Sequence, residues 1–181
     1  MHFISDLHFF HKSTLKYRPH VQTLQEMHDY MIEMWNAAVG KREDIWVLGD
    51  FALPRREDRA AMRQIFQHLH GQKHLILGNH DDTHVKRLPW QSIDWYRRIK
   101  VNKQKIILSH FPFESWDVMH YGSWHFHGHS HGNLRSILNN RLDVGIDNTD
   151  EITNIESALD WNHMGVDRPS IVDHHTPKVG R

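Results

Sequence analysis

The chain has 181 residues, 39% of them hydrophobic and 24% charged, and its 22 basic side chains balance 22 acidic ones. These values indicate one globular domain with a real core, and the balanced charge does not indicate a long nucleic acid as partner. No apolar run approaches the ~20 residues that span a membrane, and the N-terminus lacks a signal-peptide pattern, so we expect a cytoplasmic protein. The absence of cysteine excludes disulfides, thiolate nucleophiles and thiolate metal ligands.

The first half of the chain alternates strands with helices. Apolar residues recur at helical spacing over residues 23–39 and 57–70, so we expect a helix in each segment. Thr23, followed three residues later by Glu26, is typical of a helix start. Continuous apolar runs predict buried strands at residues 2–5, 45–48 and 74–77. This alternation indicates an α/β fold with helices over a largely buried sheet.

The second half of the chain contains more short strands. The predicted elements are a hairpin formed by 98–101 and 105–109, a strand at 124–127, a second hairpin formed by 135–138 and 142–146, and a short helix at 155–161. From Val166 to Arg181 the chain is polar, and we expect a tail that is packed on the surface or mobile. With no repeat or linker, residues 1–181 are expected to form a single domain.

Histidine is the unusual component of the composition, with 19 copies. A purification tag does not explain them, because the longest contiguous run is the pair His174-His175. Many of them are expected to be scattered over the surface, including His20, His28, His68, His70 and His84. The remaining question is which of the others lie where chemistry can use them.

Five polar clusters share one local context, because each follows a predicted strand. They are Asp6-x-His8, Asp50, Asn79-His80-Asp81, His110 and His129-x-His131. Each alone has a bland explanation, such as a helix cap or a tight turn. In open α/β sheets, however, ligands bind at the carboxyl ends of the strands, so we expect the five clusters to gather along one edge.

The clusters contain more metal donors than one ion needs. The donors are Asp6, His8, Asp50, Asn79, His110, His129 and His131. A tetrahedral zinc takes four ligands, whereas a larger set with one shared carboxylate matches two ions. The mixture of oxygen and nitrogen donors suits Mn, Fe, Zn, Co or Ni better than Mg or Ca.

This ordered series of motifs resembles the calcineurin-like metallophosphoesterase superfamily. All five blocks are present, in order, between residues 6 and 131. The resemblance implies a four-layer αββα sandwich, in which two mixed β-sheets are flanked by helices. It is specific for the superfamily and says little about the substrate.

The resemblance also implies a task for each residue. One metal ion is held by Asp6, His8 and His131, the other by Asn79, His110 and His129, and Asp50 bridges the two. His80 is not a ligand and acts beside the phosphate as electrostatic stabiliser or general acid, while Asp81 orients a neighbouring group. Small residues at Gly49, Gly78, Gly128 and Gly132 let backbone and substrate approach closely.

Substrate contacts should come from the loops beside this edge. We expect His11, only three residues after His8, and Arg55 to contact the substrate, together with Asn79 and His80. Basic residues of the loop after His8, such as Lys12 and Arg18, are further candidates for phosphate binding. Arg55-Arg56 departs from the Asp-Arg-Gly context of the superfamily's protein phosphatases, which disfavours a phosphoprotein substrate.

We therefore expect a phosphoesterase that hydrolyses a small phosphodiester, a cyclic nucleotide or nucleotide-like compound, by attack of a metal-bridging hydroxide. The expected cofactors are two divalent transition metal ions, with manganese first and iron, zinc, nickel or cobalt as alternatives. The alternatives are a phosphomonoesterase or nucleotide polyphosphate hydrolase on the same site, and a catalytically inactive, metal-stabilised binding module. A single-zinc hydrolase of the His-Glu-x-x-His type is excluded, because that motif is absent. The oligomeric state stays open.

Overall fold

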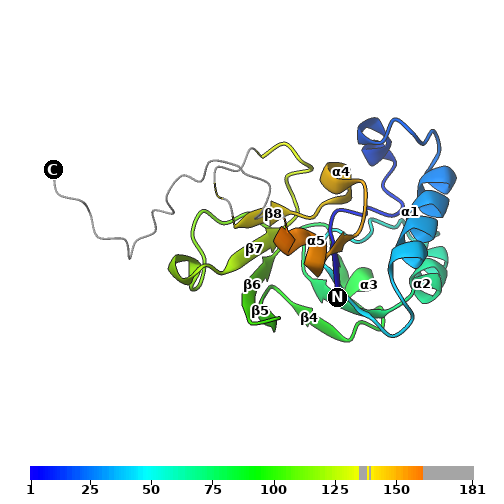
Figure 1. The fold of residues 1–181 in the computed structure, drawn as a ribbon. Coiled ribbons are helices and arrows are strands. Elements are labelled where there is room, and N and C mark those ends of the chain that lie inside the picture. The colour runs from blue at the N-terminus through cyan, green and yellow to red at the C-terminus, as the bar shows by residue number, and fades with distance from the viewer. Residues whose placement is uncertain (135–137, 139, 161–181) are drawn as a thin grey trace.

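Two mixed β-sheets, packed face to face and flanked by helices, form the protein in its computed structural model (Figure 1). The structure describes residues 1–134, 138 and 140–160. The fold class expected from the sequence is confirmed. The expected tail, 166–181, lies outside the described residues.

The first sheet has five strands in the order β4-β3-β2-β1-β9. Their bounds are Ser92–Asp94 (β4), Gln72–Ile76 (β3), Asp44–Val47 (β2), His2–Ile4 (β1) and Thr153–Asn154 (β9). Strands β1 to β4 pair in parallel and β9 runs antiparallel to β1. The carboxyl ends of the four parallel strands therefore lie at one edge.

The second sheet has the order β5-β6-β7-β8. Its strands are Tyr96–Val101 (β5), Gln104–Ser109 (β6), Trp124–His127 (β7) and Arg141–Asp143 (β8). β5 and β6 form the first predicted hairpin, whose turn residues Asn102 and Lys103 have φ of 48° and 70°, as a two-residue turn requires. Strands β6, β7 and β8 pair in parallel.

The later arm of the second predicted hairpin, 142–146, is only partly a strand, because β8 covers Arg141–Asp143. Strand β8 pairs in parallel with β7, and helix α4 (Ile146–Thr149) begins where the predicted strand 142–146 should end. The local turn signal at Asn139-Asn140 does not reveal this pairing, because β7 offers a partner from a distant part of the chain. Of the other predicted arm, 135–138, only Leu138 is among the described residues.

Helices cover the outer face of the first sheet. Helix α1 (Leu24–Ala38) and α2 (Arg59–His68) are the two long ones. The Thr23 hydroxyl accepts the N–H of Glu26 at 3.1 Å, as predicted, while the Glu26 carboxylate accepts the N–H of Gln22 at 2.7 Å. The shorter elements are η1 (Lys12–Tyr17), α3 (Thr83–Lys86), η2 (Met119–Tyr121) and α5 (Ile155–Asp160).

Two apolar cores hold these layers together. The core under the helices is formed by Met27, Met31, Trp35, Val47, Met62, Phe66 and Leu75. The core between the sheets is formed by Phe3, Trp46, Ile76, Ile106, Leu108, Trp124 and Phe126. At its centre Phe3 and Phe126 meet edge to face, with ring centroids 4.9 Å apart. This contact joins β1 to β7, the strands that precede two of the polar clusters.

The outer face of the second sheet is covered by the loop that contains η2. Trp116 and Met119 of this loop pack on Ile107. His125 is also buried there: Phe113 stacks on its ring at 5.0 Å and donates its N–H to His125 Nε2 at 3.1 Å. Nδ1 consequently carries the proton and donates to the carbonyl of Ile107 at 3.2 Å. This histidine supports the fold.

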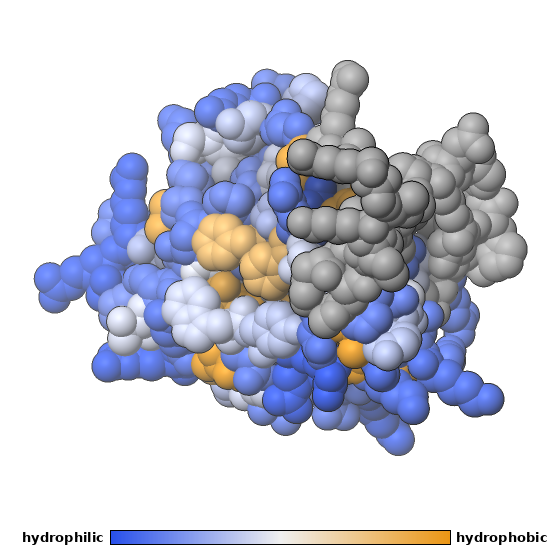
Figure 2. Space-filling view, turned by 90° about the vertical axis from the view of Figure 1, so that its left-hand side faces the viewer, coloured by the Kyte–Doolittle hydropathy of each residue, from blue (hydrophilic) through white to orange (hydrophobic). Residues whose placement is uncertain are grey.

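Outside these cores the surface is mostly hydrophilic. Figure 2 shows one face, on which hydrophobic residues (orange) gather near the centre of a largely hydrophilic surround. The exposed large apolar side chains include Trp95, Tyr96, Phe111 and Tyr121. Among the described residues, no helix has the length and apolar character needed to cross a bilayer.

His125→Ala should lower the free energy of unfolding by about 3 kcal/mol at pH 7, because it opens a cavity and leaves the Phe113 N–H without its acceptor. Its effect should also depend on pH. Burial lowers the pKa of His125 to about 3, so only the unfolded chain binds this proton between about pH 6.5 and pH 3. When the pH falls from 7 to 5, the free energy of unfolding should therefore decrease by about 2 kcal/mol more in the wild type than in the variant.

Urea denaturation at both pH values measures these differences. His68→Ala is the control, because His68 is an exposed imidazole at the end of α2 and should change stability by less than about 0.5 kcal/mol. Equal pH dependence in the wild type and in His125→Ala would show that His125 is protonated in the folded protein.

Candidate functional site

The polar clusters predicted from the sequence meet where the carboxyl ends of strands from both sheets come together. Asp6 and His8 follow β1, Asp50 follows β2, and the Asn79-His80-Asp81 cluster follows β3. His110 follows β6 of the second sheet, and His129 and His131 follow β7. A hydrogen bond crosses between the sheets here, since the N–H of His129 donates to Asp6 Oδ2 at 2.9 Å. Within the second sheet, the N–H of Gly128 donates to the carbonyl of His110 at 3.0 Å and joins the segments after β7 and β6.

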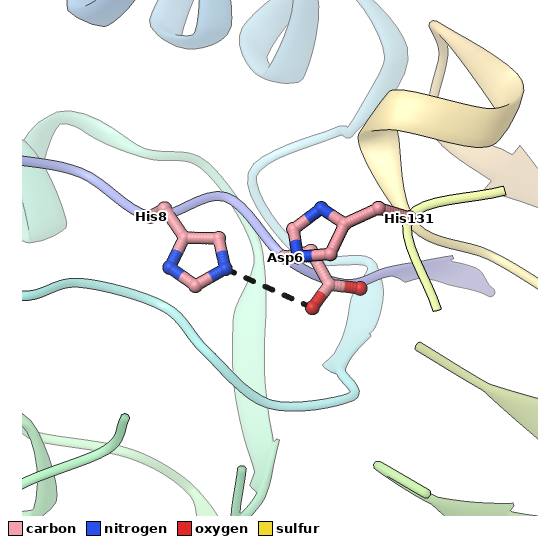
Figure 3. A group of neighbouring side chains, drawn as sticks. All are labelled: Asp6, His8 and His131. Atoms are coloured by element: carbon pink, nitrogen blue, oxygen red, sulfur yellow. Dashed lines mark ion pairs between the residues drawn. The ribbon is translucent and has the colours of Figure 1, made fainter. Parts of the chain in front are cut away.

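Asp6, His8 and His131 form the first group of donors. One donor atom from each lies within 4.8 Å of the others. Figure 3 shows the three side chains directed toward a common space, with Asp6 and His8 on the segment after β1 and His131 on a separate loop. The Nε2 atom of His8 lies 3.9 Å from Asp6 Oδ1, and the rings of His8 and His131 stack at 5.3 Å.

A second group lies beside the first and is built around Asp50. Donor atoms of Asp6, Asp50 and His110 lie within 4.8 Å of one another. One carboxylate oxygen, Asp50 Oδ2, lies 3.6 Å from His8 Nε2 and 3.5 Å from His110 Nε2. The Asn79 amide oxygen lies 3.1 Å from His110 Nε2, and the ring of His129 lies 5.1 Å from that of His110. Asp50 thus lies between the two groups.

Two atoms of the first group are buried without a hydrogen-bond partner. They are Asp6 Oδ1 and His8 Nε2, which face each other and are among the buried atoms without a partner in the described part of the chain. An unsatisfied buried polar atom is costly, and a cation that both atoms coordinate would satisfy them. The donors are imidazole nitrogens and carboxylate and amide oxygens, a set that suits divalent transition metals. The residues therefore fit the metal ions that the sequence predicts.

The protonation of the first group follows from its burial. Burial raises the pKa of the Asp6 carboxyl to about 7, although His131 opposes this effect. Burial, and then the nearby His131 and His80, lowers the pKa of His8 to about 2. His8 is consequently neutral at physiological pH, which is the form that binds a metal ion.

The backbone of the site is strained. Positive φ values occur at Asp6 (59°), His8 (50°), Asp50 (56°), His129 (69°) and His131 (47°). Residues with a side chain avoid this left-handed region, at a cost of order 1 kcal/mol each. Glycines make the close packing here feasible: a Cβ at Gly49 would collide with His110, one at Gly78 with Asp50, and one at Gly128 with Ser5. The close packing of the chain expected at these three glycines is confirmed, whereas the approach of a substrate to them stays a prediction.

Asp81 and His110 connect neighbouring loops of the site. The Asp81 carboxylate accepts the N–H groups of Asp50 at 3.0 Å, Phe51 at 2.9 Å and Gly78 at 2.8 Å, so it joins the loops after β2 and β3. His110 Nδ1 donates to the carbonyl of Leu48 at 2.8 Å. This bond fixes the tautomer and leaves the lone pair of Nε2 directed toward Asp50.

A buried ion pair supports His131 from behind. Asp147 Oδ2 accepts the Nδ1–H of His131 at 2.6 Å, and Asp147 Oδ1 accepts the Nε–H of Arg18 at 2.7 Å. Burial opposes ionisation of Asp147, but the hydrogen bonds from His131 and Arg18 outweigh it and hold the pKa of Asp147 below its usual value. Arg18 also donates to the carbonyls of Asp6 at 2.6 Å and Leu7 at 2.8 Å. The pair therefore connects both loops of the first donor group.

Two expectations from the sequence are corrected by these contacts. Arg18, expected as a phosphate-binding loop residue, is 3% exposed and points into the protein. His28, expected on the surface, is buried, and its Nε2 accepts the N–H of Phe10 at 3.0 Å, which supports the loop after His8. No local signal reveals either role, because each partner is distant in the sequence. Of the other histidines expected on the surface, His20 and His68 are exposed, and His70 and His84 are half-buried.

The predicted substrate contacts lie on the open side of the site. His80 is half-buried; its N–H donates to Asp50 Oδ1 at 2.8 Å, and its ring lies 5.3 Å from that of His8. His11 lies next to it, with ring centroids 5.7 Å apart, and His11 Nδ1 is 3.4 Å from His8 Nδ1. Arg55 lies farther out, where it lines a cavity of about 590 Å³ together with His11.

Comparisons with known proteins identify the family of the chain. A family model described as calcineurin-like phosphoesterase matches residues 2–181. Protein MJ1445 of Methanocaldococcus jannaschii, itself described as uncharacterized, is 33% identical over 135 residues, which cover 74% of this chain and 70% of that protein. The Gene 66 protein of Mycobacterium phage D29 is 29% identical over 174 residues, covering 80% of this chain and 86% of the phage protein.

Among solved structures, a protein of unknown function from Aquifex aeolicus, AQ665, has a similar fold. Its TM-score is 0.67 at 22% sequence identity, and the match covers 84% of this chain and 93% of that chain. This likeness concerns the fold alone, whereas the family model covers nearly the whole sequence. The chain belongs to the calcineurin-like phosphoesterase family.

Proposed function

We propose that this protein is a phosphodiesterase with a dinuclear metal site, acting on a small cyclic-nucleotide or nucleotide-like substrate. The observation that carries the proposal is the position of Asp50, one oxygen of which lies 3.6 Å from His8 and 3.5 Å from His110. A carboxylate between two groups of donors is the arrangement that bridges two cations. Family membership supports the hydrolase class, while the diester preference is our inference.

In this proposal each donor group holds one divalent transition metal ion. The first ion is held by Asp6, His8 and His131, the second by Asn79, His110 and His129, and Asp50 contacts both. Manganese is the expected metal, with iron, zinc, nickel or cobalt as alternatives. When bound, two such ions provide a nucleophile from water at neutral pH and neutralise charge on the phosphate.

The chain's own residues position the substrate. In the first group Asp6 and His8 are buried and His131 is half-buried, while Asn79 and His129 of the second group are exposed, so the phosphate approaches from the side of the second group. His80 is held by its backbone bond to Asp50, and its ring lies beside those of His8 and His11. There it stabilises the phosphate or gives a proton to the departing alkoxide. The expected cytoplasmic location and single-domain organisation stay predictions.

The purified protein should bind about two divalent transition metal ions per chain. Chelation should abolish hydrolysis of a generic phosphodiester, and added Mn²⁺ should restore it. Elemental analysis and titration of the metal-free protein measure the stoichiometry. A protein that stays metal-free after reconstitution, or that hydrolyses the ester without metal, would contradict the proposal.

Asp50→Asn and His80→Ala should both lower kcat by a factor of about 10² or more, but for different reasons. Asp50→Asn should also lower the metal content, because the bridging charge is lost. His80→Ala should retain the metal, because its imidazole is not a proposed ligand. His20→Ala, an exposed imidazole, is the matched control and should keep wild-type kcat. Full activity in both test variants would refute the assignment.

Asp147→Asn should weaken metal binding by about 10-fold to 100-fold, because the carboxylate that orients His131 loses its charge. Competition with a fluorescent chelator measures this affinity without any assay of activity. Asp150→Asn is the matched control at the end of the same helix, where the Asp150 carboxylate accepts the hydroxyl of Tyr30. An equal loss in both variants would mean that α4 has a general structural role only.

A further inference from the structure

A cavity of about 590 Å³ opens beside the metal site, between the loop after His8 and the loop after Asp50. Its size falls in the range of small-molecule sites. Its lining includes Phe10, His11, Lys12, Leu53, Pro54 and Arg55, together with the acidic residues Glu57 and Asp58. The catalytic chemistry proposed above uses none of this space.

The cavity is continuous with the site, because the two loops that form it are also the loops that present His8 and Asp50. Immediately beyond these residues the two loops are hydrogen-bonded to each other. The N–H of Phe9 donates to the carbonyl of Phe51 at 3.0 Å, and the carbonyl of Phe9 accepts the N–H of Leu53 at 2.9 Å. His11 stands at the boundary, 3.4 Å from His8 through their Nδ1 atoms and beside His80. A group attached to a phosphate at the metals can therefore extend into the cavity.

The chemistry of the walls is divided. Phe10, Leu53 and Pro54 are half-buried and provide an apolar wall, to which Leu24 of α1 adds. Lys12 and Arg55 are exposed at the rim, and Glu57 and Asp58 also line the cavity. The Asp58 carboxylate accepts the backbone N–H of Arg55 at 3.2 Å, whereas neither the Lys12 nor the Arg55 side chain forms an ion pair with any residue that the structure describes. A ligand that matches both features has a flat, largely apolar body and a negative charge close to it.

We propose that this cavity binds the nucleoside of a nucleotide diester that carries a second phosphate besides the scissile one. The nucleobase lies on the apolar wall, and Lys12 and Arg55 bind the second phosphate as charged donors. This inference rests on the proposed function, since the scissile phosphate must lie at the metals. It makes a short 5′-phosphorylated dinucleotide a better substrate than the same dinucleotide without that phosphate.

A competing position for the base exists on the other side of the site. The ring of Phe111 is 38% exposed, and it lies 4.7 Å from the ring of His129 and 5.0 Å from that of His110. Phe111 stands on the segment after β6, away from the paired loops that enclose the cavity. We favour the cavity, because it offers an apolar wall together with the two cations Lys12 and Arg55, whereas no cation is established beside Phe111 among the described residues.

The experiment uses the full chain loaded with Mn²⁺ and three substrates: methyl p-nitrophenyl phosphate, the dinucleotide ApA, and its 5′-phosphorylated form pApA. The wild type should show a higher kcat/KM for pApA than for ApA, and the aryl ester, which cannot reach the cavity, is the reference for the metal site alone. Leu53→Trp, which fills the cavity, should lower the ratio of kcat/KM for ApA over the aryl ester by about tenfold. Arg55→Ala should lower the ratio for pApA over ApA by about fivefold, mainly through KM.

Two controls make the result specific. Arg56→Ala removes an exposed guanidinium next to Arg55 that does not line the cavity, and it should change neither ratio. Equilibrium binding of AMP to the metal-loaded protein gives a second measurement that needs no turnover. AMP should bind the wild type and Arg56→Ala alike, and Leu53→Trp at least tenfold more weakly. Unchanged far-UV circular dichroism establishes that Leu53→Trp is folded.

Failure of this inference is distinguishable from failure of the proposed function. If the aryl ester is hydrolysed and both ratios survive Leu53→Trp and Arg55→Ala, the cavity does not bind the nucleoside. If Phe111→Ala lowers the ratio for ApA and Leu53→Trp does not, the base stacks on Phe111 and the inference is overturned. If no ester is hydrolysed by the metal-loaded wild type, the proposed function fails. The cavity assignment is then tested by AMP binding alone, and it is overturned if Leu53→Trp binds AMP as tightly as the wild type does.

Discussion

The structure depends on the apolar contact between its two sheets. Phe3 of β1 and Phe126 of β7 meet edge to face at 4.9 Å within a buried core. This packing places the carboxyl ends of β1 and β7 side by side, and through them the loops that carry Asp6 and His129. Neither sheet alone contains all the polar clusters. The site exists because burial of apolar surface holds two separate strand edges together.

The two cores also stabilise a site that is unfavourable in itself. The site combines left-handed residues with buried, unpartnered polar atoms such as Asp6 Oδ1 and His8 Nε2. Such features persist only where the surrounding structure over-determines them. Hydrogen bonds provide that support here: Asp81 joins the loops after β2 and β3, and Asp147 with Arg18 holds His131 and the backbone after β1. Asp6 Oδ1 and His8 Nε2 face each other across the space in which a cation fits, so the strained backbone and the metal donors lie in the same place.

Much of this arrangement could be predicted from the sequence, because it is encoded locally. The α/β alternation, the capped helix after Thr23, the first hairpin and the position of each cluster after a strand depend on neighbouring residues. The parallel pairing of β8 could not be predicted, since its partner, β7, is chosen by packing and not by a local turn. The same limit hid the buried position of His28, which the sequence analysis expected on the surface.

For the site, the sequence by itself determined which donors are present and where they follow strands, because a metal ligand must be a particular residue type at the end of a particular element. The family follows from that order. Only the tertiary structure decided that Asp147 supports His131, that Arg18 turns inward and that a cavity lies beside His11. Arg18 and Asp147 are 129 residues apart, and a carboxylate so distant leaves no trace in the pattern around its partner. Contacts of this kind arise from how the packed layers meet, which residue spacing does not encode.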